Sequence, residues 1–433
     1  MAKRAFKANY KRTRYEFIEK AVNETLKDKE LPIYVHIPFC RGICKFCPYV
    51  RFPLGDGKLI SKYIEALKSE IKAYGNLMKE LNIKVIDIHA GGGTPSLLPG
   101  EQFKEILETI TEYFDCEAKI AIEANPEDLA DENHTSELAN SGVTEVSLGV
   151  QSFYNEMLKE LGRRHSAEQS LQAIENLRKA GIKHVNIDMM YMIPNQSLNN
   201  WIADLQLAAQ QDVDEITCYP TLITEYCLGS KFVKKGEVNQ PNRRIYKQMV
   251  CITEKLLTSR GFKPVEIYGY SKKDGWKYAT VNYEMEGPLL GFGCGAMGFL
   301  ESYEYQNTCS LLEYIRATSN RKLPIAGGRS VTAEERAIRY ATSRLFICRS
   351  LDLNEFEHKI GNFEELIGKS GFGKALALLR LLGYIKKSSR KLVLSPRGLF
   401  TAHLLCWAFV LNVPCRMCEE YLKTPWPLEV TIP

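Results

Sequence analysis

The stretch that decides the fold is IYVHIPFCRGICKFCPY, residues 33–49. Its first seven residues are mostly apolar and are typical of a short buried strand. Cys40, Cys44 and Cys47 follow directly, whereas the other ten of the chain's 13 cysteines are scattered. A strand that runs into closely spaced thiols predicts a chemical site on the loop at the strand's carboxyl end.

The pattern of this first strand repeats along the chain. Short apolar runs alternate with longer segments of helical periodicity between residues 33 and 223. Nearly continuous apolar runs are typical of a parallel sheet covered by helices. The expected strands are 33–39, 85–91, 119–125, 145–152, 184–191 and 215–223, and the expected helices are 58–81, 100–114, 166–182 and 198–212. Periodicity alone leaves open whether these units form a full or partial barrel or an open doubly wound sheet.

The sequence pattern changes after residue 223, where the alternation of strand-like and helical segments becomes less regular. A helix is expected near 243–260, and a glycine-rich turn follows at 291–298. Further on, a helix that stops at Gly383 precedes two strand-like pieces, which favours a small winged-helix or accessory module. Pro and Gly residues in LPIAGGRS indicate a boundary. We expect three parts: a basic N-terminal segment (1–30), a barrel domain (31–325) and a smaller, mainly helical C-terminal domain (326–433).

Bulk composition limits the class of protein. With 433 residues, 45% of them apolar, the chain can bury a large core, and an odd number of unevenly spaced cysteines does not suggest a disulfide framework. A net charge of +5 is too balanced to indicate nucleic acid. The basic start lacks the apolar run of a signal peptide, and the longest apolar segment, 399–413, is shorter than the roughly 20 residues a bilayer needs. We expect a cytoplasmic protein without a membrane span.

The cysteine spacing C-x3-C-x2-C predicts an iron–sulfur site. Electron-carrying [4Fe–4S] clusters use four cysteine ligands, so three would leave one iron open to bind and activate a small molecule. Phe46, between two of the cysteines, would shield such a cluster. The alternatives are three reduced cysteines in a loop, or a zinc site that His36 completes.

This cysteine motif resembles that of the radical S-adenosylmethionine (SAM) enzymes, specifically the oxygen-independent coproporphyrinogen III oxidase family. The similarity extends over nearly the whole chain. Its motifs, in chain order, are HIPFCRGICKFC (36–47), GGGTPSLL (91–98), IEANPEDL (122–129), VSLGVQSF (146–153), LGRRHS (161–166), NIDMMYMIPNQS (186–197) and LGFGCGAMG (290–298).

The resemblance implies a fold and a chemistry. The fold would be α/β, a partial (β/α)6 TIM-like barrel that carries a [4Fe–4S] cluster on Cys40, Cys44 and Cys47. SAM would chelate the open iron, and transfer of one electron to its sulfonium would give a 5′-deoxyadenosyl radical that abstracts hydrogen from the substrate. The electron would come from a reducing donor such as flavodoxin or ferredoxin.

The resemblance also implies which residues contact SAM. Glycines after the second strand would let the backbone approach the ligand closely. Carboxylates suit ribose hydroxyls or an ammonium group, and an Arg guanidinium can clamp a carboxylate. The expected cofactor-binding residues are Gly91, Gly92, Gly93, Thr94, Glu123, Gln151, Arg163, Asp188 and Ala296, and Tyr34 is expected as a catalytic aromatic residue near SAM.

One departure leaves the substrate open. The best-known decarboxylating members have a fourth cysteine, which does not bind the cluster, where this chain has Tyr49. We therefore expect an oxidoreductase of porphyrin biosynthesis acting on coproporphyrinogen III, or an enzyme for a related tetrapyrrole or other conjugated compound. The alternatives are a methyltransferase or cyclopropanase that uses two SAM molecules, and a haem-binding chaperone, against which the long C-terminal segment argues. An unrelated alternative is a structural protein that stores zinc or iron.

Three further groups of residues have less specific predictions. Arginines near the site are candidates for substrate carboxylates, histidines are candidate axial haem ligands, and late cysteines form either a second metal site or ordinary buried thiols. The arginines are Arg51, Arg163 and Arg164, the histidines are His165, His358 and His403, and the cysteines are Cys406, Cys415 and Cys418.

Overall fold

A sheet of nine strands forms the centre of the computed structural model, which describes residues 8–13, 15–27, 29–55, 57–221, 242–273, 287–406 and 412–432. The strand order is β10-β11-β9-β8-β7-β6-β5-β2-β12. Six of these strands are parallel and follow chain order: β2 (Glu30–Ile37), β5 (Lys84–Gly92), β6 (Asp115–Ala124), β7 (Glu145–Gln151), β8 (His184–Tyr191) and β9 (Glu215–Pro220). The expected partial (β/α)6 barrel is thereby confirmed.

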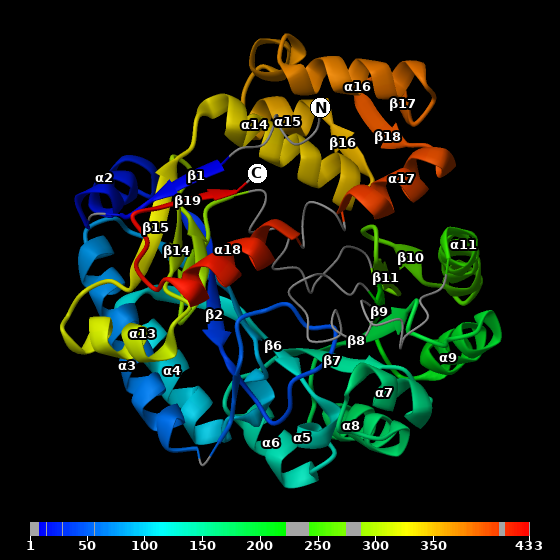
Figure 1. The fold of residues 1–433 in the computed structure, drawn as a ribbon, viewed down its shortest axis with the longest axis horizontal. Coiled ribbons are helices and arrows are strands. Elements are labelled where there is room, and N and C mark those ends of the chain that lie inside the picture. The colour runs from blue at the N-terminus through cyan, green and yellow to red at the C-terminus, as the bar shows by residue number, and fades with distance from the viewer. Residues whose placement is uncertain are drawn as a thin grey trace.

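Helices cover the outer face of this sheet, as Figure 1 shows. Their amphipathic sequences supply the apolar faces that pack on the strands. Ser166 and Ser197 are the N-caps of two of these helices, and each forms a complete capping box. The covering helices are α3 (Lys58–Met78), α4 (Gly100–Tyr113), α6 (Glu132–Asn140), α7 (Asn155–Leu161), α8 (Ala167–Lys179), α9 (Leu198–Gln210) and α11 (Arg243–Ser259).

The two edges of the main sheet differ. On one side, β12 (Leu290–Phe292) runs parallel to β2. On the other, β11 (Gly269–Ser271) and β10 (Lys263–Pro264) continue the sheet in antiparallel fashion from β9. In the described residues these edges do not pair with each other, so the barrel stays open on one side.

A second sheet lies beside the barrel and contains strands from both ends of the chain. Its strands are β13 (Met297–Phe299), β14 (Tyr303–Asn307), β15 (Ile325–Ser330), β1 (Ala8–Lys11) and β19 (Glu429–Ile432), in that order. Tyr10 and Val430, from opposite ends of the sequence, belong to the same hydrophobic core as the barrel strands. Helices α2 (Tyr15–Thr25), α13 (Leu311–Ser319) and α18 (Asn412–Lys423) complete this region.

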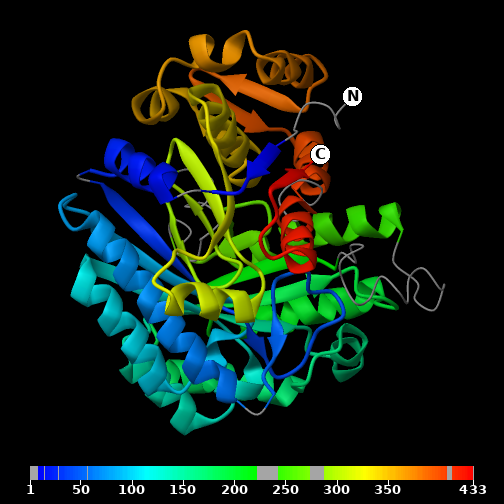
Figure 2. The same cartoon turned by 60° about the vertical axis from the view of Figure 1, so that its left-hand side comes forward.

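The region after β15 forms a smaller unit with its own apolar cluster. A three-stranded sheet, β16 (Ser350–Asp352), β18 (Lys391–Leu394) and β17 (Ile385–Ser388), packs with helices α14 (Ala333–Thr342), α15 (Leu353–Lys359), α16 (Gly371–Leu381) and α17 (Pro396–Cys406). Ile267 and Tyr268 from the barrel region join its apolar cluster. In Figures 1 and 2 this unit, drawn in orange, lies at one end of the barrel. The division at residues 30 and 325 remains our proposal.

None of the helices in the described ranges has the length and apolar character needed to cross a membrane. The apolar segment 399–413 contributes to α17 and α18, while residues 407–411 lie outside the described residues.

Candidate functional site

Polar side chains from neighbouring strands line the inside of the barrel. In the sheet register, Ser147 lies opposite Asn186, and Asp188 lies opposite Thr217. Because side chains alternate between the two faces of a strand, these four share the interior face. Asn186 Nδ2 donates to Ser147 Oγ (2.7 Å) and Asp188 Oδ1 (2.9 Å). The hydroxyls of Ser147 and Thr217 complete the network, which gives the interior a fixed polar surface.

Glu123, near the end of β6, faces the glycine-rich turn that follows β5. Its Oε2 accepts a hydrogen bond from the Gly92 backbone N–H (3.1 Å), and its Oε1 lies 3.4 Å from His89 Nε2. Burial acts to raise the pKa of Glu123, but the interactions with His89 and Gly92 outweigh burial and lower the pKa. Glu123 is therefore ionised at neutral pH.

Asp188 responds to its surroundings in the opposite way. Burial, reinforced by the charge of Glu123, raises the pKa of Asp188 from 3.8 to about 7. When two carboxyl groups share one site, both do not ionise readily unless a cation or hydrogen-bond donors lie between them. The pair is therefore suited to a ligand that carries positive charge or donates hydrogen bonds.

Tyr34 and His36 form an ordered pair at the end of β2. His36 Nε2 donates to the Val50 carbonyl oxygen (2.9 Å), which leaves Nδ1 to accept from the Tyr34 hydroxyl (2.8 Å). The Tyr34 ring also stacks on His89, with 5.9 Å between ring centroids. Tyr34 is thus held in one orientation inside the barrel.

The three cysteines lie on the loop that leaves this strand. Cys40 ends the short strand β3 (Phe39–Cys40), which pairs with β4 (Phe52–Pro53) and so closes the loop at its base. The Lys45 backbone N–H donates to the Leu161 carbonyl oxygen (3.0 Å). Phe46 packs against an apolar cluster formed by Met157, Leu161, Met190 and Ile193. These contacts fix the loop over the barrel's end before any cofactor binds.

The thiols differ in their surroundings. Cys40 is buried, and Cys44 and Cys47 are half-buried. Desolvation raises the pKa of Cys40, and it raises the pKa of Cys47 to about 12. Both thiols are therefore protonated in the metal-free protein, and iron must displace their protons when it binds. The Thr94 hydroxyl already donates a hydrogen bond to the Cys40 sulfur (3.5 Å).

The arrangement does not suit a zinc site completed by His36, because both ring nitrogens of His36 are engaged in the hydrogen bonds described above. Across the described parts of the chain, no three His, Cys, Asp or Glu side chains converge in a way suited to a single metal ion. A cubane cluster requires a different arrangement of ligands, since each thiolate binds a different iron and the thiols need not converge on one atom. Three thiols at separate positions on a fixed loop fit that arrangement.

Arg163 connects the cysteine loop with the barrel. Its Nη1 donates to the Cys44 sulfur (3.6 Å), and its Nη2 donates to Asn125 Oδ1 (2.6 Å) and to the Gly149 carbonyl oxygen (2.9 Å). Its buried Nε has no hydrogen-bond partner among the described residues. The guanidinium can therefore offer a further N–H to a ligand carboxylate.

The turn after β5 brings backbone close to the other site elements. Gly92 has a φ of 106°, and a Cβ there would lie 2.3 Å from the His36 ring. A Cβ on Gly93 would lie 2.6 Å from the Phe39 carbonyl oxygen. Residues with side chains are excluded at both positions, so the turn presents bare backbone next to Glu123 and the cysteine loop. Gly91 and Thr94 flank this turn.

The second glycine-rich turn, residues 291–298, lies beside the first strand because β12 pairs with β2 and places Gly291 opposite Tyr34. A buried carboxylate holds it: Glu70 Oε2 accepts from the Gly293 backbone N–H (2.8 Å). Ala296 is buried in this turn, and its carbonyl oxygen accepts from the Asn307 backbone N–H (2.9 Å). The turn thus approaches the barrel from the side opposite Asp188.

The other predicted residues occupy varied places. Gln151 is buried at the end of β7, with a φ of 68° at a shift in the β7–β8 register. Arg164 is exposed, and the Arg51 guanidinium donates to the Tyr49 carbonyl oxygen (2.6 Å). Cys418 lies 3.3 Å from Gln306 Nε2. The side chains of Cys406 and Cys415 lie outside the described residues.

Sequence reasoning did not single out several residues that position this site. His89 and Asn125 contact Glu123 and Arg163, respectively, and Glu70 holds the second glycine turn. His89 lies two residues before Gly91, and Asn125 lies two residues after Glu123 within the motif 122–129, so their period-two placement was a usable signal. Glu70 lies in the middle of a helix, and nothing in its local sequence indicates its role.

Comparisons with known proteins found a family model and several relatives that match this chain. Residues 34–208 match the Radical SAM superfamily. The Heme chaperone HemW of Lactococcus lactis subsp. lactis (strain IL1403) is 30% identical over 291 residues, which cover 67% of this chain and 75% of that protein. An Oxygen-independent coproporphyrinogen III oxidase of Bradyrhizobium diazoefficiens is 28% identical over 394 residues, covering 86% of this chain and 87% of the relative.

The overall fold has a solved counterpart. Coproporphyrinogen III oxidase (HemN) from Escherichia coli, described as a radical SAM enzyme, superimposes with a TM-score of 0.78 at 21% identity, and the match covers 93% of this chain and 95% of that one. At this identity the likeness establishes the fold. Taken with the sequence matches, it shows that the chain belongs to the radical SAM superfamily, in the family of coproporphyrinogen III oxidase and HemW, whose members use a [4Fe–4S] cluster and SAM.

Proposed function

We propose that this protein is a radical SAM enzyme that removes a hydrogen atom from a tetrapyrrole, and that oxidative decarboxylation of coproporphyrinogen III is its reaction. The match to the oxidase from Bradyrhizobium diazoefficiens supports this choice, because it extends over 86% of the chain and includes the region after the barrel. The matches to HemW proteins cover less, 62–70% of the chain.

The residues present fit both cofactors. Cys40, Cys44 and Cys47 would hold the cluster, and the backbone of residues 91–94 would border SAM, since side chains are excluded at Gly92 and Gly93. When bound, these groups supply a one-electron reductant and a 5′-deoxyadenosyl radical for hydrogen abstraction. A donor of the flavodoxin or ferredoxin type would provide the electron for SAM cleavage, and a one-electron acceptor would take the electron that the substrate radical releases as CO2 leaves and the vinyl group forms.

The chain's own side chains would bind and orient SAM. Arg163 would offer its free Nε–H to the carboxylate of SAM. Glu123 and Asp188 would accept hydrogen bonds from the ribose hydroxyls or the ammonium group, with Asp188 losing its proton as the cationic ligand binds. Gln151 and Ala296 would border SAM from the strand β7 side and from the second glycine turn. Tyr34, fixed by His36, would close the space on the substrate side.

One observation carries the proposal: Arg163 contacts the Cys44 sulfur on the cysteine loop and Asn125, directly after β6, at the same time. A ligand that the guanidinium holds would therefore lie between the cysteine loop and the end of β6, which carries Glu123. This is the arrangement that reductive cleavage of SAM requires, because positioning of the reacting groups supplies much of the rate.

The test is anaerobic turnover. The protein is reconstituted with iron and sulfide, supplied with SAM, a strong reductant and coproporphyrinogen III, and analysed by mass spectrometry. The proposal predicts 5′-deoxyadenosine together with stepwise loss of two carboxyl groups. Deoxyadenosine with an unchanged porphyrinogen would reject this substrate, and S-adenosylhomocysteine with a methylated product would instead favour a methyltransferase or cyclopropanase.

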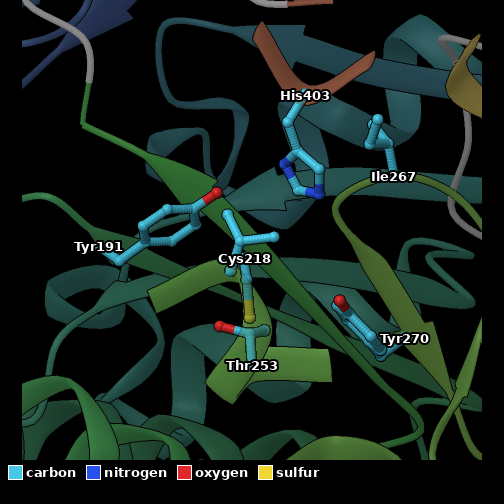
Figure 3. A pocket seen from close by; sticks show the side chains of 7 residues that line it. Tyr191, Cys218, Thr253, Ile267, Tyr270 and His403 are labelled. Carbon is cyan, nitrogen blue, oxygen red and sulfur yellow. The ribbon is translucent and has the colours of Figure 1, made fainter. Parts of the chain in front are cut away.

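A second candidate is haem binding, which the names of the HemW relatives favour. Of the candidate axial ligands, His165 is buried and hydrogen-bonded to Val150, and His358 is exposed. His403 is buried, and neither of its ring nitrogens has a hydrogen-bond partner among the described residues. Figure 3 shows its ring in a cavity with Tyr191 and Cys218.

This cavity leaves no space even for a water molecule, so a haem would reach His403 only after the surrounding elements separate. Titration of the protein with haemin, followed in the Soret band, tests this candidate. A saturable shift that His403→Ala abolishes would support it. A wild-type protein without a saturable shift would remove it.

A further inference from the structure

Asn125 lies directly after β6, at the start of the short helix α5 (Pro126–Leu129). Its backbone is held in place, since the Asn125 N–H donates to the Ser96 hydroxyl (3.1 Å) and its carbonyl oxygen accepts from the Asp128 N–H (3.1 Å). An Asn at this position commonly caps the helix with its side chain, but Asn125 makes no such bond to the described residues of α5. Its side-chain amide therefore serves other contacts.

The Arg163 guanidinium determines which way round this amide lies. Arg163 Nη2 lies 2.6 Å from Asn125 Oδ1. A guanidinium carries only hydrogen-bond donors, so the amide oxygen must face it and the amide nitrogen must point elsewhere. The orientation of the Asn125 amide thus follows from the chemistry of its partner.

The amide nitrogen in turn orients the hydroxyl of Thr94. Asn125 Nδ2 lies 3.1 Å from Thr94 Oγ1, and because an amide nitrogen only donates, the Thr94 oxygen accepts this bond. The hydroxyl has one hydrogen, which is left for the Cys40 sulfur at 3.5 Å. Thr94 is buried, so water does not compete for that hydrogen. Three hydrogen bonds of fixed direction therefore connect the Arg163 cation with a cysteine of the loop.

The same guanidinium contacts a second cysteine, because Arg163 Nη1 donates to the Cys44 sulfur (3.6 Å). The Asn125 amide thus connects the donors that serve two of the three cysteines assigned to the cluster. Hydrogen bonds to the sulfurs are one of the factors that set the reduction potential of an iron–sulfur cluster. They raise the potential, because the reduced cluster carries the more negative charge and accepts hydrogen bonds more strongly.

We propose that Asn125 is a positioning residue of the iron–sulfur site: its amide directs the Thr94 hydroxyl onto Cys40 and thereby raises the reduction potential of the cluster. This inference rests on the cluster that forms part of the proposed function, and it does not depend on the substrate. Contacts behind the ligands commonly tune metal sites in this way. A less negative potential lets the external electron donor reduce a larger fraction of the cluster.

The test is the reduction potential of the reconstituted cluster, measured without SAM and followed by electron paramagnetic resonance. Thr94→Val removes the donor to Cys40 and should shift the equilibrium toward oxidised cluster about tenfold, which is about 59 mV for one electron. Thr94→Ser keeps the hydroxyl and should shift the equilibrium less than about threefold. Thr135→Val is the matched control, because Thr135 is also buried but its hydroxyl donates to the Leu129 carbonyl oxygen.

Asn125→Asp tests the role of the amide itself. An ionised carboxylate has nearly the same shape but only accepts, so it would take the Thr94 hydrogen away from Cys40. Adding Thr94→Val to Asn125→Asp should therefore shift the equilibrium less than about threefold. The added charge cancels in this comparison, because both proteins carry it. Asn125→Ala, which leaves the hydroxyl without a director, replaces Asn125→Asp if that variant takes up no iron, and it should likewise reduce the effect of Thr94→Val.

The outcomes separate this inference from the proposed function. An equal effect of Thr94→Val in wild type and in the Asn125 variant would overturn the role of Asn125 while leaving the tetrapyrrole reaction in place. A Thr94→Val cluster with the wild-type potential would overturn it as well. A wild-type protein that takes up no cluster on anaerobic reconstitution would overturn both this inference and the proposed function.

Discussion

Arg163 Nη1 lies 3.6 Å from the Cys44 sulfur, although the two residues are 119 positions apart in the sequence. The same guanidinium is bonded to Asn125 and Gly149 at the barrel end. The burial of Arg163 acts to lower its pKa, but Cys44 and Glu127 outweigh this effect and raise it. The side chain is therefore a permanent cation that links the cysteine loop to the proposed SAM site.

Replacing Arg163 with Lys should weaken SAM binding. Lys keeps the charge but cannot make the same set of planar hydrogen bonds, and hydrogen bonds to charged groups are worth about 1.5–3 kcal/mol. We expect the KM for SAM to rise about 10- to 100-fold, since each 1.4 kcal/mol is a factor of ten. The neighbouring exposed Arg164→Lys is the control. Similar KM values for the two variants would contradict the role given to Arg163.

Gly92→Ala should abolish SAM cleavage. A Cβ at this position meets the His36 ring in addition to being strained by a φ of 106°. Gly181→Ala separates the two effects, because Gly181 has a φ of 78° and a Cβ added there would meet no atom within 4 Å. We expect Gly181→Ala to cost about 1 kcal/mol of unfolding free energy and to retain cleavage. Equal loss of activity in both variants would count against the close approach at Gly92.

Phe46→Ala should loosen the cysteine loop. Phe46 is partly buried against Met157, Leu161, Met190 and Ile193. Truncation of such a side chain removes about 1–3 kcal/mol of packing. We expect an iron chelator to remove the reconstituted cluster several-fold faster from Phe46→Ala than from wild type, as followed by the visible absorbance of the cluster. Phe46→Leu should lose its cluster at a rate close to that of wild type. Unchanged loss in Phe46→Ala would show that the apolar contact does not hold the loop.

The stability of the protein should depend on pH through His403. Burial, assisted by the charge of Arg349, lowers the pKa of His403 from 6.5 to about 3. The unfolded chain takes up a proton below pH 6.5 while the folded chain does not, so this stability is present above pH 6.5 and is lost as the pH falls toward 3. Between pH 7.5 and pH 5 the loss is about 2 kcal/mol.

His403→Phe removes this titration and both unpartnered nitrogens. We expect the difference in unfolding free energy between variant and wild type, from urea denaturation, to shift by about 2 kcal/mol in favour of the variant between pH 7.5 and pH 5. A difference that is the same at both pH values would mean that His403 becomes protonated without unfolding.

Cys44→Ser should remove the cluster while leaving the fold largely intact. The loop is fixed by the β3–β4 pair and by Phe46, so its position does not depend on the thiol. We expect loss of the cluster's visible absorbance and of SAM cleavage, with unchanged circular dichroism. Cys251→Ser is the matched control, because Cys251 is an exposed free cysteine on α11. Substantial SAM cleavage by Cys44→Ser would contradict the ligand assignment.

Strands buried on both faces were predictable from the sequence. The run at 184–191 coincides with β8, in which every residue but one is buried. β6 begins at Asp115, four residues earlier than expected, since residues 115–118 form no apolar run, alternate between exposed and half-buried positions and pair only with β5. β1 and β19 have no apolar run, and they form because distant segments meet.

The site was predictable to the extent that its residues stand in ordered motifs. The motifs indicate which strand ends meet, and the structure places Glu123, Arg163 and the cysteine loop around one space. The partners that set their charge and orientation depend on contacts between distant segments. Glu70 is an example, because its bonds to Gly293 and Asn307 span more than 200 residues.

The most direct test of the central claim is isotope transfer. Coproporphyrinogen III deuterated in its propionate side chains is turned over anaerobically with SAM and reductant, and 5′-deoxyadenosine is analysed by mass spectrometry. The account predicts deoxyadenosine that carries deuterium, formed together with decarboxylated product. Deoxyadenosine without deuterium, alongside an unchanged porphyrinogen, would contradict hydrogen abstraction from this tetrapyrrole.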